Sequence, residues 1–302
     1  MKFKPLIIAF FCVAVLGTVL FVFLASQKTR KADVPKSVPV PAAPLELPSE
    51  TKTRNPERRV LGLSVEGREI ESYIFGSGRA QLVFVGGIHG GYEWNSVVLA
   101  YELMDYLEQN PGIIPENAAV TVIPDANPDG VYKVIGKEGR FAAADVPGGS
   151  KESGRLNARL VDLNRNFDCN WKPKGIWRES SVSGGTAPFS EPETAAIKKF
   201  VLENKPAAVI FWHSQSDAIY GSQCGADMLP ETIEIMNAYS AASGYRAVAT
   251  FDQYEVSGDA TDWLASINIP AMTVELKTHE TIEWDRNLPG IKALFKYYGN
   301  KK

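Results

Sequence analysis

Residues 81–95 read QLVFVGGIHGGYEWN and combine a candidate buried strand with polar side chains at its end. The stretch Gln81–Val85 is largely apolar on consecutive positions, as a strand covered on both faces should be. It runs into a glycine-rich turn that carries His89 and Glu93. Such strands are typical of sheets that lie between helices, where polar residues at the carboxyl ends of strands form the site.

Other segments of the chain repeat this pattern and predict the fold class. Further short apolar runs predict strands at Ala119–Ile123, Ala207–Trp212 and Ala271–Leu276. Amphipathic stretches predict helices at Asn95–Leu107, Glu191–Leu202, Pro230–Ser243 and Pro289–Tyr298. Ser190 followed by Glu-Pro-Glu is a good helix start, with Ser190 as the cap. The alternation predicts an α/β domain whose mixed, largely parallel sheet is flanked by helices on both faces.

Two more predicted strands end in candidate catalytic residues. His213 directly follows one strand, and Glu275 ends another. His89, Glu93 and His213 would form a His2Glu set that leaves one position open, as in catalytic zinc sites. A single histidine at a strand end is more often a hydrogen-bonded loop residue. These residues by themselves therefore leave a zinc site and an ordinary polar cluster equally open.

Further motifs follow in a fixed order: ANPDG at 126–130, VDLNRNF at 161–167, a strand-end HS at 213–214, SGDATDW at 257–263 and VEL at 274–276. With these motifs the chain resembles the zinc carboxypeptidases of the pancreatic carboxypeptidase A and B type, from about residue 86 to residue 276. The resemblance implies their fold in a single catalytic domain and one Zn²⁺ per chain. It also implies hydrolysis of the C-terminal bond of peptides with a free carboxylate.

The resemblance also implies roles for individual residues. His89, Glu93 and His213 match the zinc ligands, and Glu275 matches the general base that deprotonates water. Arg155 matches the arginine that stabilises the oxyanion, with Arg140 and Arg159 as nearby alternatives. Zinc, a carboxylate base and a fixed cation together are suited to hydrolysis of an amide by water.

The remaining matched residues concern the substrate. Asn164, Arg165 and Tyr254 match the group that binds the terminal carboxylate, for which the planar fork of an arginine is well suited. Thr261 matches the base of the specificity pocket and favours a tolerant pocket. Asp259 is either a second pocket residue that accepts basic side chains or a turn residue that points to solvent.

The spacing of the first two ligands departs from the family. The family commonly has His-x-x-Glu, whereas His89 and Glu93 are separated by one residue more. Two glycines in the loop permit a bulge that returns the carboxylate to the metal. The alternative is that Glu93 lies beside the site and does not ligate.

The amino end predicts a membrane-anchored protein. Residues 6–25 hold no charged side chain and are long enough to span a bilayer, so residues 1–27 are interpreted as an anchor or an uncleaved signal. Residues 28–57 are a proline-rich linker, and 58–302 are the catalytic domain. We expect that domain to be extracytoplasmic, or secreted if the signal is cleaved. Residues 60–302 carry a net charge of −9, which argues against a nucleic-acid partner.

Several alternatives stay open. Cys169 and Cys224 either pair or remain free thiols, and His279 is expected to be a loop residue near the cleft. One alternative function is an amidase or peptidase that cleaves cell-wall peptides, including γ-D-glutamyl bonds to diaminopimelate. The other is a non-catalytic peptide-binding module. Retention of Glu275 and both ligand histidines argues against that module.

Overall fold

The computed structural model describes residues 56–148 and 151–301, which fall in one compact unit. Its centre is an eight-stranded sheet in the order β1-β2-β4-β3-β7-β10-β8-β9. The strands of this sheet are β1 (Glu57–Leu63), β2 (Glu69–Gly76), β3 (Ala80–Val85), β4 (Ala118–Ile123), β7 (Ala208–Ser214), β8 (Ala218–Gly221), β9 (Arg246–Val248) and β10 (Ala271–Leu276). A separate hairpin joins β5 (Lys174–Trp177) to β6 (Ser180–Ser183).

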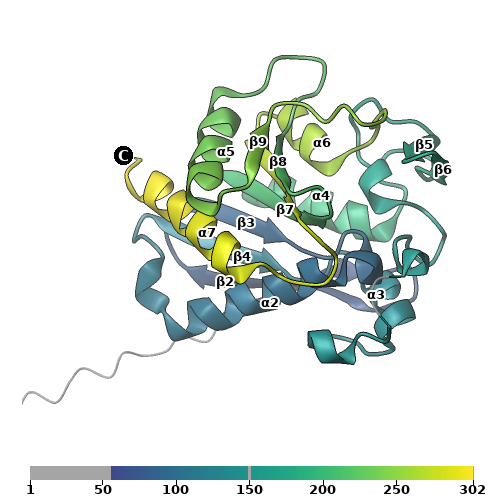
Figure 1. Cartoon of the computed structure of the whole chain (residues 1–302), viewed down its shortest axis with the longest axis horizontal. Coiled ribbons are helices and arrows are strands. Elements are labelled where there is room, and N and C mark those ends of the chain that lie inside the picture. The colour runs from purple at the N-terminus through teal and green to yellow at the C-terminus, as the bar shows by residue number, and fades with distance from the viewer. Residues whose placement is uncertain (1–55, 149–150, 302) are drawn as a thin grey trace, which may run out of the picture. The chain divides into compact units, whose positions relative to one another are not determined.

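Helices pack on both faces of the sheet (Figure 1). They are α2 (Trp94–Gln109), α3 (Pro128–Ile135), α4 (Pro192–Asn204), α5 (Pro230–Ser243), α6 (Ala260–Ser266) and α7 (Trp284–Gly299). Successive strand residues point to opposite faces. In β3, Leu82 and Phe84 accordingly join the core under α2, α5 and α7, whereas Val83 and Val85 join the core under α4 and α6. The predicted mixed, largely parallel sheet with helices on both faces is confirmed.

The three central strands run in the same direction. Strand β7 pairs in parallel with β3 on one side and with β10 on the other. Their carboxyl ends therefore meet at one edge of the sheet, which is where ligands bind in open α/β sheets. The register places Glu275 of β10 directly beside His213 of β7.

The four predicted strands and four predicted helices are present, with two differences in the helices. Helix α4 is capped at Glu191 rather than Ser190, because the hydroxyl of Ser190 is hydrogen-bonded to Asn166 and Glu191 instead. Helix α7 begins at Trp284, so Pro289 lies inside it and not at its start. Pro289 is the sixth residue of this helix and has no backbone N–H, so one i→i−4 hydrogen bond is absent from the second turn.

The predicted membrane anchoring is not borne out and is corrected here. Its basis, residues 6–25, lies outside the described residues, as does the predicted linker up to residue 55. Among the described residues, no helix is both long and apolar enough to cross a membrane.

Candidate active site

Three buried donor side chains converge at the carboxyl edge of the sheet. His89 lies after β3, Glu93 ends the short 3-10 helix η1 (Gly90–Glu93), and His213 lies near the end of β7. The Glu93 carboxylate lies 2.8 Å from Nδ1 of His89 and 3.0 Å from Nδ1 of His213. The two Nδ1 atoms are 3.2 Å apart. The predicted His2Glu set is therefore brought together and forms a possible metal site.

This donor set fits zinc. Ligand atoms about 2.0–2.1 Å from a tetrahedral zinc lie roughly 3.3 Å from one another, close to the separations found here. Burial alone would raise the pKa of the Glu93 carboxyl, but the two imidazoles hold that pKa well below its ordinary value. The carboxylate is therefore present in its charged form, as a metal ligand must be.

The 3-10 turn of η1 accommodates the extra residue between His89 and Glu93. Gly90 has a φ of +48°, and a Cβ there would lie 2.5 Å from the carbonyl oxygen of Gly154 and 2.8 Å from the backbone of Gly130. Only glycine fits such a contact. The tight turn returns the Glu93 carboxylate to both imidazoles, and the backbone N–H of Ser214 donates to it at 3.2 Å.

A fully buried carboxylate, Asp162, contacts both His89 and Arg155. One of its oxygens lies 3.3 Å from Nε2 of His89, and the other accepts from Nε of Arg155 at 3.0 Å. Burial opposes the charge, but Arg155 and then His89 hold the pKa of Asp162 well below its ordinary value. The contact with Nε2 does not have hydrogen-bond geometry. The charge of a carboxylate this close still favours the proton on Nε2, which leaves the lone pair of Nδ1 for the metal position. Sequence reasoning assigned Asp162 no role, although an acid inside VDLNRNF is a natural partner for a ligand histidine.

Glu275 and Arg155 line the same cavity as the donor set, and the volume of this cavity is about 910 Å³. Burial raises the pKa of Glu275 to about 7. Arg155 is only 2% exposed, and its Nη1 lies 3.7 Å from the Glu93 carboxylate. The alternatives lie elsewhere, since Arg140 pairs with the exposed Asp105 and Arg159 is itself exposed. The structure therefore places Arg155, and neither alternative, in the site.

The residues expected to bind the substrate carboxylate line this cavity too. Arg165 is fixed by the carbonyl oxygen of Ile176, which accepts from Nε at 3.1 Å and from Nη2 at 3.0 Å. Asn164 lies next to it, and Tyr254 is half-buried on the opposing loop. Burial raises the pKa of the Tyr254 hydroxyl, so it is a neutral hydrogen-bond donor at ordinary pH.

Asp259 lies at the start of α6 and is engaged within the fold. One carboxylate oxygen accepts from the backbone N–H and the hydroxyl of Thr261, both at 2.7 Å. The other accepts from Nδ2 of Asn164 at 2.8 Å. Asp259 is thus a helix cap that also orients Asn164. A neighbouring acid that sequence reasoning missed, Asp262, lines the cavity, and burial followed by the charge of Asp259 raises its pKa to about 7.

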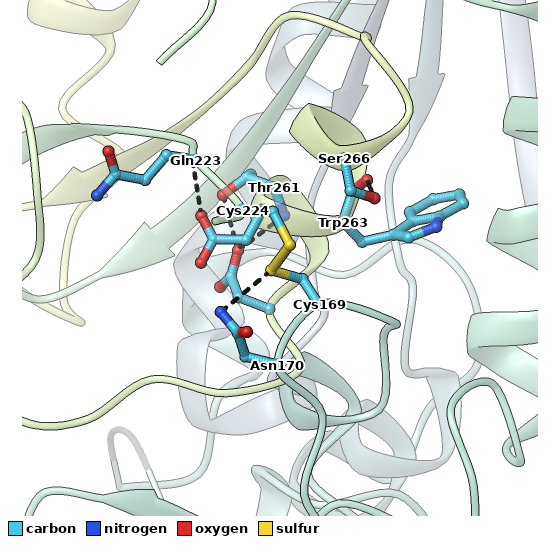
Figure 2. The surroundings of a disulfide bond; sticks show 9 residues. Cys169, Asn170, Gln223, Cys224, Thr261, Trp263 and Ser266 are labelled. Carbon is cyan, nitrogen blue, oxygen red and sulfur yellow. Dashed lines mark hydrogen bonds between the residues drawn. A yellow bond between two sulfur atoms is a disulfide. The ribbon is translucent and has the colours of Figure 1, made fainter. Parts of the chain in front are cut away.

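A disulfide joins two loops at the wall of this cavity. Cys169 and Cys224 are bonded, so the pairing that the sequence left open is present (Figure 2). The neighbouring residues Asn170 and Gln223 line the cavity, and the backbone N–H of Gln223 donates to Asp262 at 3.0 Å. The bond therefore holds together loops that are far apart in sequence and shape the pocket.

His279 lies beside the site without being one of its donors. Its Nδ1 is 2.7 Å from the hydroxyl of Ser214, and its ring packs against Tyr92 with centroids 4.5 Å apart. Ser214 directly follows the candidate ligand His213. His279 is thus a loop residue near the cleft, as expected.

A buried His2Glu set, a neighbouring carboxylate, a buried arginine and a large cavity at a sheet edge are the features of a metal-dependent hydrolase. The sequence profile of the zinc carboxypeptidase family matches residues 49–289. The chain therefore belongs to the zinc carboxypeptidase family.

Similar proteins agree with this assignment. γ-D-Glutamyl-L-diamino acid endopeptidase 1 of Lysinibacillus sphaericus is 25% identical over 242 residues, which cover 72% of this chain and 59% of that protein. The chain thus spans about three fifths of the length of this curated relative. Murein-tripeptide amidase of Escherichia coli O157 has the same fold, with a TM-score of 0.59 and 23% identity over 82% of this chain and 93% of that one. Carboxypeptidase A of Helicoverpa armigera has a TM-score of 0.60 and 20% identity over 81% and 68%.

Proposed function

We propose that the chain is a metallocarboxypeptidase that removes the C-terminal residue of peptides with a free carboxylate. The observation that carries the proposal is the shared cavity. It holds the Arg165 guanidinium, fixed by the carbonyl of Ile176, together with Glu275 and the His2Glu donors. A terminal carboxylate bound at Arg165 would set the adjacent peptide bond near the donors and the base.

The residues suggest how the bond is cleaved. When bound by His89, Glu93 and His213, zinc supplies Lewis acidity that polarises a carbonyl and makes water a better nucleophile near neutral pH. Glu275 accepts the proton of the attacking water and passes it to the leaving amine. Arg155, held by Asp162, places a fixed positive charge where negative charge develops on the carbonyl oxygen.

A second candidate is an amidase or peptidase that releases a diamino acid from a γ-glutamyl bond in cell-wall peptides. The γ-D-glutamyl-L-diamino acid endopeptidase relative supports it, because its match covers 72% of this chain. The acids Asp259 and Asp262 in the cavity also suit a leaving residue with a second amino group. The same base and arginines serve both reactions.

We propose a tolerant pocket for the leaving residue. Thr261 at its base is uncharged, and a partly solvated acid contributes only about 0–1 kcal/mol to the binding of an amine. Peptides that end in Phe, Leu and Lys should therefore differ by less than about tenfold in kcat/KM. The variants Asp259→Asn and Asp262→Asn identify which acid affects kcat/KM for the peptide that ends in Lys. Failure of the wild type to cleave that peptide would contradict a tolerant pocket.

The main test compares peptides with a free and an amidated C-terminus, beside a γ-glutamyl diamino acid. Arg165→Ala should reduce kcat/KM for the free carboxylate far more than for the amide, because a charge-assisted pair is lost. Glu275→Gln should retain zinc and abolish turnover. Equal losses on both C-termini would argue against a carboxypeptidase, and full turnover by Glu275→Gln would remove that residue from its role.

A further inference from the structure

The β5–β6 hairpin carries a cavity-lining arginine that the proposed function does not use. Strand β5 is fixed to the carboxylate-binding group at Ile176, whose carbonyl accepts from Arg165. Trp177 ends the strand, and Arg178 follows it in a left-handed conformation with φ of +56°. Both side chains line the cavity.

Trp177 lies next to the groups expected at the cleaved bond. Its ring lies 4.4 Å from the Arg155 guanidinium and packs edge-on against Tyr92 with centroids 5.4 Å apart. Tyr92 directly precedes Glu93. Strand β5 therefore leads away from Arg165, which would hold the leaving residue, and past Arg155. Its end lies on the side that would receive the acyl part of the substrate.

Arg178 has much of its charge available there. Its Nη2 donates to the hydroxyl of Tyr92 at 3.1 Å, and its Nη1 is 3.7 Å from Glu152. The side chains of Arg178 and Glu152 are 52% and 67% exposed, so their ion pair is weak. Arg155, in contrast, is paired with the buried Asp162.

A guanidinium beside an aromatic ring is suited to a carboxylate on a residue with an apolar body, because the planar fork binds both oxygens. Resting on the proposed function, we propose that Arg178 and Trp177 form an acyl-side subsite for a carboxylate on the residue whose carbonyl is attacked. Two linkages supply such a group. They are an α-linked glutamyl residue, through its side chain, and a γ-linked glutamyl residue, through its free α-carboxylate.

The test uses two matched pairs of peptides with the same leaving residue. One pair has α-linked glutamate or glutamine on the acyl side, and the other has γ-linked glutamate with its α-carboxylate free or amidated. In at least one pair the wild type should prefer the acid about threefold to fivefold in kcat/KM, as a partly exposed ion pair allows. The preference should decrease with salt. Arg178→Gln should abolish it, whereas Arg178→Lys and the distant control Arg140→Gln should retain it. The pair that responds identifies the linkage.

A binding experiment separates this subsite from the proposed reaction. The same peptides are titrated into zinc-loaded Glu275→Gln with and without Arg178→Gln, and the ratio of Kd values for acid and amide is measured. A ratio that depends on Arg178 supports the subsite even if no peptide is hydrolysed. If the peptides are hydrolysed but the Kd ratio does not depend on Arg178, the subsite is wrong and the proposed reaction stands. A wild-type preference for the amides would have the same meaning. If none of the four peptides binds, in either linkage, both proposals are wrong.

Discussion

Replacing Asp162 by Asn tests the support behind the metal ligands. The substitution keeps the shape of the side chain and an oxygen that can accept from the backbone N–H of Asn164, now at 3.1 Å. It removes the charge that faces Arg155 at 2.9 Å and His89 at 3.3 Å. With its oxygen in that place, the amide nitrogen faces the Arg155 guanidinium, donor against donor. The neutral oxygen left beside Nε2 of His89 holds the proton on that nitrogen less firmly than a carboxylate does.

Two magnitudes follow from these contacts. Loss of a carboxylate that orients a ligand histidine weakens metal binding by about 10- to 100-fold. Removal of one partner of a buried ion pair costs about 3–5 kcal/mol, and we expect the lower end because the amide keeps one hydrogen bond. The metal-free variant should therefore unfold at a lower temperature than the metal-free wild type.

The assay is a competition titration of zinc between metal-free protein and a chromophoric chelator, followed by thermal unfolding. Asp168→Asn is the matched control, because that aspartate is exposed and six residues further along the same loop. A zinc Kd for Asp162→Asn within twofold of wild type would show that this carboxylate does not orient His89. The same conclusion would follow if Asp168→Asn had an equal effect.

Three other perturbations have defined outcomes. Burial raises the pKa of Asp125 to about 8. The contribution of this group to stability is therefore fully present at low pH. It is lost as pH rises from about 4 to 8, at up to about 1.4 kcal/mol of unfolding free energy per pH unit. Asp125→Asn should flatten the fall in unfolding free energy between pH 5 and pH 8 in denaturant titrations, and an unchanged slope would contradict the assignment. The disulfide closes a separation of 55 residues, so Cys169→Ser with Cys224→Ser should lower stability by about 4 kcal/mol; a melting temperature unaffected by the double change or by a reductant would argue against the bond. Gly90→Ala should cost about 1–3 kcal/mol and weaken zinc binding, because its Cβ meets the Gly154 carbonyl at 2.5 Å, whereas Gly112→Ala, with open space around its Cβ, should do neither.

The buried strands could be predicted from the sequence because burial on both faces leaves an unbroken apolar run. All six residues of β4 are buried, and its predicted bounds are correct to one residue. Strand β1 is largely exposed and rich in charge, so it carries no such signal. The β5–β6 hairpin is short and polar. It is held by contacts of Ile176 with Arg165 and of Ser183 with Asp162, residues that lie outside its own sequence. Local patterns do not contain that information.

The candidate site was predictable for residues at strand ends and in distinctive motifs. His213 and Glu275 are adjacent because β7 and β10 pair in parallel. The sequence predicted both strands and a largely parallel sheet, but not which strands are neighbours. Asp259 was harder, because its role depends on where α6 begins and on the distant Asn164. Arg178 carried no sequence signal, since an exposed arginine in a turn is ordinary until the fold brings it to Tyr92.

The close contact among Gly90, Gly130 and Gly154 also bears on how this site tolerates mutation. Each position lies against the backbone of another, so a side chain at any one of them would move the same turn. Substitutions there should be non-additive, since the first displaces the turn and the second then meets less resistance. The four-residue step from His89 to Glu93 depends on this contact. A designed metal site that uses the His89–Glu93 spacing in another protein would therefore need all three glycines as well.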